Sequence, residues 1–543
     1  MSISNLAASF LALMASLVTP VAAQTTSFTA TFTTTNHQSI ESLVRSFQGT
    51  GAVGGLGNTV VVLNLNYVLS EQDYVTGIGP VAPVLTIWPN RPDSIVINPG
   101  AGQNVVQDPN FSTATLSVGA NGTGTYAGLT ASGLTLTLTR TSTSPLRFNV
   151  SLRGSVTVAG RTTDLAMANV PVSQTITQIN VFDRDTGTCS MPPLGDGNLT
   201  MTIRPDSNRW DDKVKFVELG IVCSLSPTDS FRIFSIVDID PTTDRATPRS
   251  SDLGGGMGKF LGATGTAQIV NIEQLSGDLL RITVNGTITQ ASATTPIVGV
   301  VNTASGLAGN GIAQNDWIEI KGMNLVPKNT PAGGMYWSNA PEFAQGKMPT
   351  QLGGVSVTVN DKPAYVWWFC SAATTPACIG DQINVLTPLD DYTHQVKVVV
   401  KNGADSSSPF IVTKVETTPS ILLLSTRGDA VATHPDGSIV GPASLYPGAS
   451  TPARRSETIS VWGVGFGLPT TPLAAGSSTQ AGSLPYTPAC YFGGTQTQVA
   501  AALVSPGLYQ FNVTIPENAA SGDNPFYCTI PNNWTLPAVI AVQ

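Results

Sequence analysis

The sequence predicts an all-β protein, in which an N-terminal β-sandwich or barrel region precedes two further β-sandwich domains. Short segments are rich in β-branched residues and often alternate between apolar and polar residues, as at 59–65, 134–139 and 355–359. The 53 glycines and 38 prolines interrupt these segments at short intervals, as turns do. Beyond the first 23 residues the one fair helix candidate is 38–47. The lack of long amphipathic helices excludes doubly wound α/β folds and TIM barrels.

Length and composition support several folded domains. At about 100–200 residues per domain, the 543 residues correspond to three or four domains. The hydrophobic share of 41% is enough for several cores, so the chain is not of the disordered class. The net charge of −8 argues against a nucleic-acid partner, because phosphate contacts need clustered Lys and Arg. Only three His are present, which excludes His-rich metal chemistry.

Residues 1–23 predict a secretory signal peptide. The apolar run 6–18 is followed by small residues at Val21 and Ala23, which fit a cleavage site after Ala23. The first five residues lack Lys and Arg, and a buried apolar helix is the alternative interpretation. The run is shorter than the roughly 20 residues that cross a bilayer, so we expect no membrane insertion. The expected location is secreted, or extracellular at the cell surface.

Six cysteines predict three disulfides. An even number of Cys in an exported chain is typical of disulfide bonding. Their positions fall into three neighbouring couples, which predict the bonds Cys189–Cys223, Cys370–Cys378 and Cys490–Cys528. A zinc site is the alternative, but the CxxC pairs and nearby His that it needs are missing.

The N-terminal region, 24–292, contains a repeated glycine motif. Gly122-Thr-Gly-Thr-Tyr126-Ala-Gly128 resembles Gly256-Met-Gly-Lys-Phe260-Leu-Gly262. A similar strand end follows each motif, at 154–157 and at 286–289. The spacing predicts two related β units, near 24–160 and 161–292. A tight turn in which Gly supplies positive φ is the simpler interpretation of each motif.

The C-terminal half contains a second repeat. Residues 316–325 parallel 457–467, and 382–388 parallel 510–516. In each copy the final proline of the second motif precedes a closing strand. The sequence therefore predicts two copies of one β-sandwich, at 296–415 and 419–543.

These two copies carry a family resemblance. The turn Gly463-Val-Gly-Phe-Gly467 and the segment Cys490-Tyr-Phe-Gly-Gly494 resemble the IPT/TIG family of immunoglobulin-like domains. The whole of 296–543 resembles the C-terminal domain of secreted acidobacterial (Solibacter-type) proteins. The motifs that carry this second resemblance are Val301-Asn-Thr-Ala-Ser305, Leu352-Gly-Gly-Val-Ser-Val-Thr-Val-Asn360, Gln382-Ile-Asn-Val385 and His434-Pro-Asp-Gly437. The resemblance implies two tandem immunoglobulin-like sandwiches in an exported modular protein, and it implies no catalytic residues.

Clustered aromatic residues are the candidate binding site. The segment Tyr365-Val-Trp367-Trp368-Phe runs into the Cys370–Cys378 insert, and Tyr336-Trp337 lies in a preceding Gly- and Pro-rich loop. Adjacent Trp residues on a strand cannot both face one core, so at least one is expected to face outward. Exposed aromatic faces stack on sugars or pack against a protein partner. The alternative is that these residues form core and interdomain packing.

Acidic residues offer weaker candidates. Asp183-Arg-Asp185-Thr-Gly187 begins like a calcium-binding loop, which makes Asp183 and Asp185 candidate ligands for structural calcium, but an Asx turn is the simpler interpretation. No other cofactor is expected. Glycoside hydrolysis needs two converging carboxylates, and the candidate pairs are Asp211/Asp212, Asp238/Asp240 and Asp390/Asp391.

The sequence therefore favours an exported, non-enzymatic binding or surface protein, which binds a carbohydrate or a cell surface through exposed aromatics. The scarcity of His and the lack of a Gly-x-Ser-x-Gly nucleophile motif support this view. Expected partners are a polysaccharide or a cell-surface protein. Two alternatives stay open, a secreted polysaccharide hydrolase with 24–292 as its catalytic region and a structural component of the cell envelope.

Overall fold

Strands dominate the computed structural model, so the all-β prediction is confirmed. The structure describes residues 25–69, 81–90, 93–98, 106, 111–143, 146–206, 214–240, 242–243, 245–304, 311–378, 380–425 and 427–543. The predicted signal segment, 1–23, lies outside the described residues. Within the described ranges, no helix is both long enough and apolar enough to cross a membrane.

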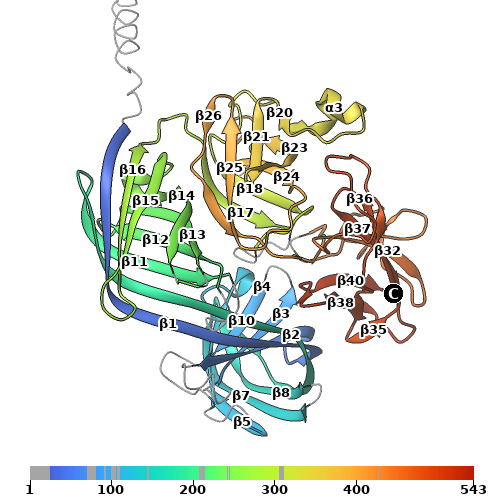
Figure 1. The fold of residues 1–543 in the computed structure, drawn as a ribbon. Helices are drawn as coiled ribbons and strands as arrows, with labels where there is room; N and C mark the ends of the chain where they lie inside the picture. Colours follow the sequence, from blue (N-terminus) through green and yellow to red (C-terminus); the bar gives the residue numbers. More distant parts are fainter. Residues whose placement is uncertain are drawn as a thin grey trace, which may run out of the picture.

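Sixteen N-terminal strands form one continuous sheet that wraps around two hydrophobic cores (Figure 1). Two long strands, β1 (Thr25–Val53) and β10 (Met167–Met191), pair with each other and run through both cores. The first barrel-like unit adds β2 (Gly57–Leu69), β3 (Val81–Asn90), β4 (Asp93–Asn98), β5 (Thr113–Ser117), β6 (Gly119–Gly122), β7 (Thr130–Thr143), β8 (Leu146–Val158) and β9 (Arg161–Asp164). The second adds β11 (Gly195–Pro205), β12 (Phe216–Ser224), β13 (Ser230–Ile239), β14 (Ala246–Met257), β15 (Thr264–Gln274) and β16 (Leu280–Thr289).

The two units exchange the ends of their long strands. The end of β1, around Phe47, pairs with β2 and packs in the first core, whereas its beginning, around Phe28, pairs with β16 in the second. The strand β10 does the reverse, because Val172 packs in the first core and Cys189 in the second. A division of the chain at residue 160 therefore does not separate the two cores, because Phe28 lies before it and packs in the second core, whereas Val172 lies after it and packs in the first.

The helix expected at 38–47 is wrong, because these residues are part of β1. Here β1 is a central strand, paired with β10 on one side and β2 on the other. Helix propensity is a weak preference of a few tenths of a kcal/mol per residue. Pairing with β10 along the segment, and with β2 from Glu41 onward, outweighs it.

The repeated glycine motif has a structural cause. In each unit a short 3₁₀ turn precedes a β-hairpin, namely η1 (Gly124–Tyr126) and η2 (Gly258–Phe260). A Cβ atom on Gly122 would lie 2.2 Å from the carbonyl oxygen of Tyr126, and one on Gly256 would lie 2.7 Å from Cβ of Phe260. Only glycine lets each turn fold back this closely on its strand.

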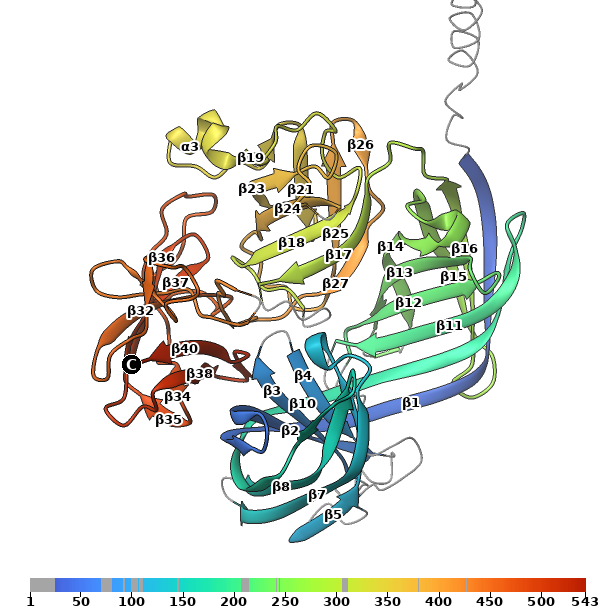
Figure 2. The same ribbon diagram turned by 180° about the vertical axis from the view of Figure 1, so that it is seen from behind.

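The C-terminal half forms two sandwiches, each with its own core (Figure 2). One sheet of the first sandwich has the order β17 (Ile297–Thr303), β18 (Trp317–Met323), β24 (Asp381–Leu386), β23 (Tyr365–Cys370) and β19 (Met335–Tyr336). The other contains β20 (Gln351–Leu352), β21 (Val355–Val359), β22 (Lys362–Pro363), β25 (Gln395–Asn402), β26 (Asp405–Ser406) and β27 (Phe410–Thr413). A turn η3 (Trp337–Asn339) and a short helix α3 (Pro341–Ala344) follow β19.

The second sandwich repeats this two-sheet architecture. Its larger sheet contains β28 (Ser420–Ile421), β29 (Ala432–Thr433), β30 (Ile439–Val440), β31 (Ser450–Thr451), β32 (Thr458–Val464), β33 (Gly482–Ser483), β36 (Val499–Ser505) and β37 (Leu508–Thr514). Its smaller sheet contains β34 (Ala489–Phe492), β35 (Thr495–Thr497), β38 (Gly522–Ile530), β39 (Asn533–Trp534) and β40 (Ala538–Val542).

The four units form a ring (Figures 1 and 2). The second barrel contacts the first sandwich, where the backbone N–H of Gln395 donates to Glu218 at 2.8 Å. The two sandwiches meet where the indole N–H of Trp317 donates to the carbonyl of Pro506 at 3.0 Å. The second sandwich closes the ring on the first barrel, because Tyr527 packs against Val62.

The three disulfides join the predicted pairs, Cys189–Cys223, Cys370–Cys378 and Cys490–Cys528. They are typical of proteins that fold in an oxidising compartment. Cys189–Cys223 ties β10 to β12 across β11 inside the second core.

We expect removal of this bond by the double substitution Cys189→Ala/Cys223→Ala to lower the free energy of unfolding by about 2–4 kcal/mol. The bond spans 34 residues, whereas Cys370–Cys378 spans only 8. The Cys370→Ala/Cys378→Ala control should therefore cost about 1 kcal/mol less, because the shorter loop restricts the unfolded chain less. Urea unfolding of both variants checks this order, and the reverse order would contradict the loop-length argument.

Candidate functional site

Six aromatic side chains gather on the first sandwich and form what we call the aromatic face. The members are Trp317, Tyr336, Trp337, Phe343, Trp367 and Trp368. The ring of Trp367 lies 5.4 Å from that of Trp317 and 6.4 Å from that of Tyr336, in edge-to-face contacts. Tyr336 and Trp367 are 46% and 37% exposed, so part of this cluster faces solvent.

A β-bulge places two consecutive tryptophans in this cluster. The pairing of β23 with β24 shifts between Val366 and Trp368, which leaves Trp367 as the extra residue. Regular alternation would send adjacent side chains to opposite faces of the sheet, and a bulge relaxes that rule. Trp367 is exposed and Trp368 is half-buried, which agrees with the expectation that at least one of them faces outward.

Two loops hold the cluster in place. The indole N–H of Trp368 donates to the carbonyl of Gly333 at 3.0 Å, and the Gly333 N–H donates to the hydroxyl of Thr375 at 3.1 Å. Thr375 belongs to the loop that Cys370–Cys378 closes. A Cβ atom on Gly334, whose φ is +90°, would lie 2.4 Å from the Trp368 indole nitrogen, so only glycine permits this contact.

Polar side chains continue the aromatic face across the outer side of the same sheet. Glu319 and Lys321 on β18 form an ion pair at 2.8 Å, and Asn384 on β24 accepts a hydrogen bond from Gln382 at 2.9 Å. Asn384 is also paired in register with Glu319 and with Trp368. The sheet therefore presents amides and charges directly beside the aromatic rings.

The structure brings all five aromatic residues predicted as ligand-binding into one neighbourhood, but in two roles. Tyr336, Trp367 and Trp368 reach the surface or lie just below it. Tyr365 is only 9% exposed and lies against Gly476 of the second sandwich, and Trp337 packs beside it in the same small cluster at this junction.

The predicted calcium ligands occupy a different setting. Asp183 and Asp185 lie within β10, so the expectation of a loop or Asx turn is wrong. The reason is the pairing of β10 with β1 and β11, which keeps this segment extended. Alternate residues of a strand share a face, and the register sets Asp183 opposite Ser39 and Asp185 opposite His37. In the described ranges, no group of three or more His, Cys, Asp or Glu side chains could hold a metal ion.

Sequence reasoning missed the pair that His37 makes with Asp185. The His37 Nδ1 atom lies 2.8 Å from the carboxylate of Asp185, which is fully buried. Burial raises the pKa of Asp185, and the hydrogen bond from His37 opposes that rise. Only the register of β1 against β10 joins these residues, which are 148 positions apart, and no local motif encodes it.

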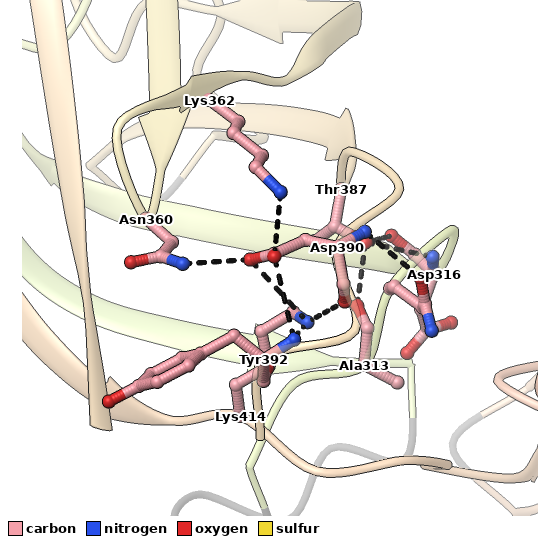
Figure 3. Close-up of polar contacts among 9 residues, drawn as sticks. Ala313, Asp316, Asn360, Lys362, Thr387, Asp390, Tyr392 and Lys414 are labelled. Atoms are coloured by element: carbon pink, nitrogen blue, oxygen red, sulfur yellow. Dashed lines mark hydrogen bonds and ion pairs between the residues drawn. The ribbon is translucent and has the colours of Figure 1, made fainter. Parts of the chain in front are cut away.

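A buried charge network in the first sandwich is structural (Figure 3). The Lys414 ammonium is 1% exposed and donates to the carbonyls of Asp390 and Tyr392. The Asp390 carboxylate also accepts hydrogen bonds from Lys362 at 2.7 Å and from Asn360 at 2.9 Å. Burial alone would raise the pKa of Asp390, but these hydrogen bonds and the charge of Lys414 lower it overall. The charged groups of this network are paired with one another, so we assign it a role in stabilising the fold.

The carboxylate pairs considered for glycoside hydrolysis gain no support from their contacts. Asp238 is bound by the guanidinium of Arg249, and Asp240 accepts hydrogen bonds from backbone N–H groups of its own turn. Asp390 belongs to the buried network. Asp211 and Asp212 lie outside the described residues. Comparison of the chain with protein-family models and with curated proteins finds no match.

Proposed function

We propose that the chain is an exported binding protein that holds a polysaccharide or cell-surface glycan on the aromatic face, without turnover. The observation that carries the proposal is the exposed pair Tyr336 and Trp367, held beside the polar side chains of Glu319 and Asn384. Sugar rings present C–H groups on their faces and hydroxyls at their edges. Aromatic faces and neighbouring amides or carboxylates match these two features.

Rigidity supports the same proposal. The bulge, the contact at Gly334 and the closed loop 370–378 hold Trp367 and Trp368 before any ligand arrives. A preformed site loses less conformational entropy on binding. The disulfides and the apolar N-terminal segment support export.

The first test is a binding screen of oxidised protein against immobilised cellulose, xylan, chitin and cell-wall glycans, in which released sugars are measured in the same wells. We expect retention on at least one polymer without released products. We expect Trp367→Ala to weaken retention by roughly tenfold or more, as loss of an aromatic hot spot does.

Tyr446→Ala is the matched control, because Tyr446 is a similarly exposed aromatic, 40% accessible, on the second sandwich. Equal weakening by both substitutions would point to non-specific adsorption and contradict the proposal. Released oligosaccharides would instead favour the hydrolase alternative. Retention only by other copies of the chain would favour an envelope scaffold.

A further inference from the structure

The second barrel-like unit contains a cavity of about 630 Å³ at one end. Its walls are largely aliphatic and include Ile203, Val217, Leu219, Ile239, Ile272 and Leu280. These residues lie at the ends of β11, β13 and β15 and at the beginnings of β12 and β16. The volume falls within the range of small-molecule sites, which is about 300–1,000 Å³.

A buried aromatic residue lies at the opposite end of the same barrel. The turn η2 follows β14 there, and its Phe260 is 1% exposed and contacts the ring of Phe231 at 5.9 Å. The described lining residues all lie at the other end of the barrel, so a ligand would enter there.

One wall of the cavity is polar, and its groups are mostly acceptors. Five lining residues form this wall, His37 and Ser39 from β1, Asp183 from β10, Gln274 from the end of β15 and Asp278 from the turn before β16. The Ser39 hydroxyl donates to Asp183 at 2.6 Å, so its proton is already used. The second His37 nitrogen, Nε2, lies 4.0 Å from the carboxylate of Asp278.

A fully buried carboxylate lies on the same face of β10 as Asp183. Asp185 sits opposite His37 on one side and opposite Met201 on the other, within the aliphatic core. His37 contacts one of its oxygens, but Oδ2 has no hydrogen-bond partner in the part of the chain that the structure describes. A buried acceptor without a partner costs folding free energy, which is typical of a group kept for function.

We propose that this cavity binds a small apolar molecule that carries a primary or secondary ammonium group. The aliphatic walls would take the apolar body. Asp183, Asp278 and His37 would surround the ammonium, whose N–H donors match their acceptor atoms. The two lining carboxylates, Asp183 and Asp278, against one imidazole leave this wall negative whether or not His37 is protonated.

Two rival occupants fit the wall less well. A quaternary ammonium has no N–H donor and is typically held by the faces of Trp, Tyr or Phe rings, but none of the described lining residues is one of these three. A divalent cation needs several free carboxylate oxygens at short range. Here Ser39 already occupies one oxygen of Asp183, and His37 occupies one oxygen of Asp185.

Calorimetric titration of the full chain with 1-adamantanemethylamine tests the proposal, with 1-adamantanecarboxylate, 1-adamantanemethanol and calcium chloride in parallel. We expect the amine to bind on the order of tenfold or more tightly than the carboxylate or the alcohol. Asp183→Asn and Asp278→Asn should each weaken amine binding severalfold. Asp278 is 76% exposed, so its substitution does not threaten folding.

Two controls separate this site from the aromatic face. Asp405→Asn removes an exposed carboxylate from the first sandwich, and Trp367→Ala alters the proposed glycan site. Both should leave amine binding unchanged, so glycan binding and amine binding can fail independently. The proposal is overturned if no amine binding is seen, if amine and carboxylate bind equally, if calcium binds in place of the amine, or if Asp183→Asn and Asp278→Asn leave the affinity intact.

Discussion

Replacing Lys414 by Met is expected to lower the free energy of unfolding by about 3–5 kcal/mol, the range for removing one partner of a buried ion pair. Met keeps most of the volume of the side chain but removes its charge and its donors. The carbonyls of Asp390 and Tyr392 then lose a shared donor, and the Asp390 carboxylate loses its nearest buried cation. Lys362 remains beside Asp390, but half of its side chain is exposed, so it cannot replace the buried charge.

Urea unfolding followed by tryptophan fluorescence measures this effect, because four of the eight tryptophans lie between residues 317 and 368 in the first sandwich. Lys401→Met is the matched control, since Lys401 is exposed on β25 of the same domain. It should change stability by less than about 0.5 kcal/mol, as surface substitutions do. Equal losses in the two variants would show that the buried network is not what Lys414 stabilises.

Features encoded locally were predictable from the sequence. Alternating β-branched segments predicted the strands, because a strand with one buried face needs that alternation. Neighbouring couples of cysteines predicted the three bonds. The repeated motif that contains Gly122 and Gly256 could be recognised in the sequence, because both turns need a residue without a Cβ atom at this position.

Features set by strand register were not predictable. The pairing of His37 with Asp185 depends on how β1 aligns with β10, and a slip of either strand by one residue would turn that strand's side chain to the other face. The exposure of Trp367 depends on a bulge that the surrounding sequence does not predict. The aromatic residues themselves could be selected as candidates, but their division into surface and interdomain groups required the positions of both sandwiches.

The ring places two buried carboxyl groups at the junctions between units. Glu218, 4% exposed, lies between the second barrel and the first sandwich. Asp316 is fully buried where the sandwiches meet, and it accepts hydrogen bonds from the Thr418 hydroxyl and from the Trp317 backbone N–H. Burial raises the pKa of both groups to about 7, although the hydrogen bonds to each carboxyl oppose the rise.

We therefore expect these two groups to make the protein less stable as the pH rises from 5 to 8. In the unfolded chain they ionise near their ordinary values of 4.5 and 3.8, whereas in the folded chain they keep their protons until about pH 7. Their contribution to stability is thus fully present below the unfolded pKa and is lost as the pH rises through 7. At about 1.4 kcal/mol per pKa unit, each group should cost roughly 2–3 kcal/mol between pH 5 and pH 8.

Urea unfolding at several pH values between 5 and 8 measures this slope. Glu218→Gln and Asp316→Asn keep an acceptor for the same backbone N–H groups but cannot ionise, so each variant should be less sensitive to pH than the parent chain. Comparison with the parent is needed because burial lowers the pKa of His394, which acts in the opposite direction at the same junction as Glu218. Asp390, whose pKa is lowered, loses its contribution only at more acidic pH and does not affect this window. Unchanged slopes in both variants would mean that the carboxyls at the two junctions ionise normally in the folded protein, and that the ring tolerates their charge.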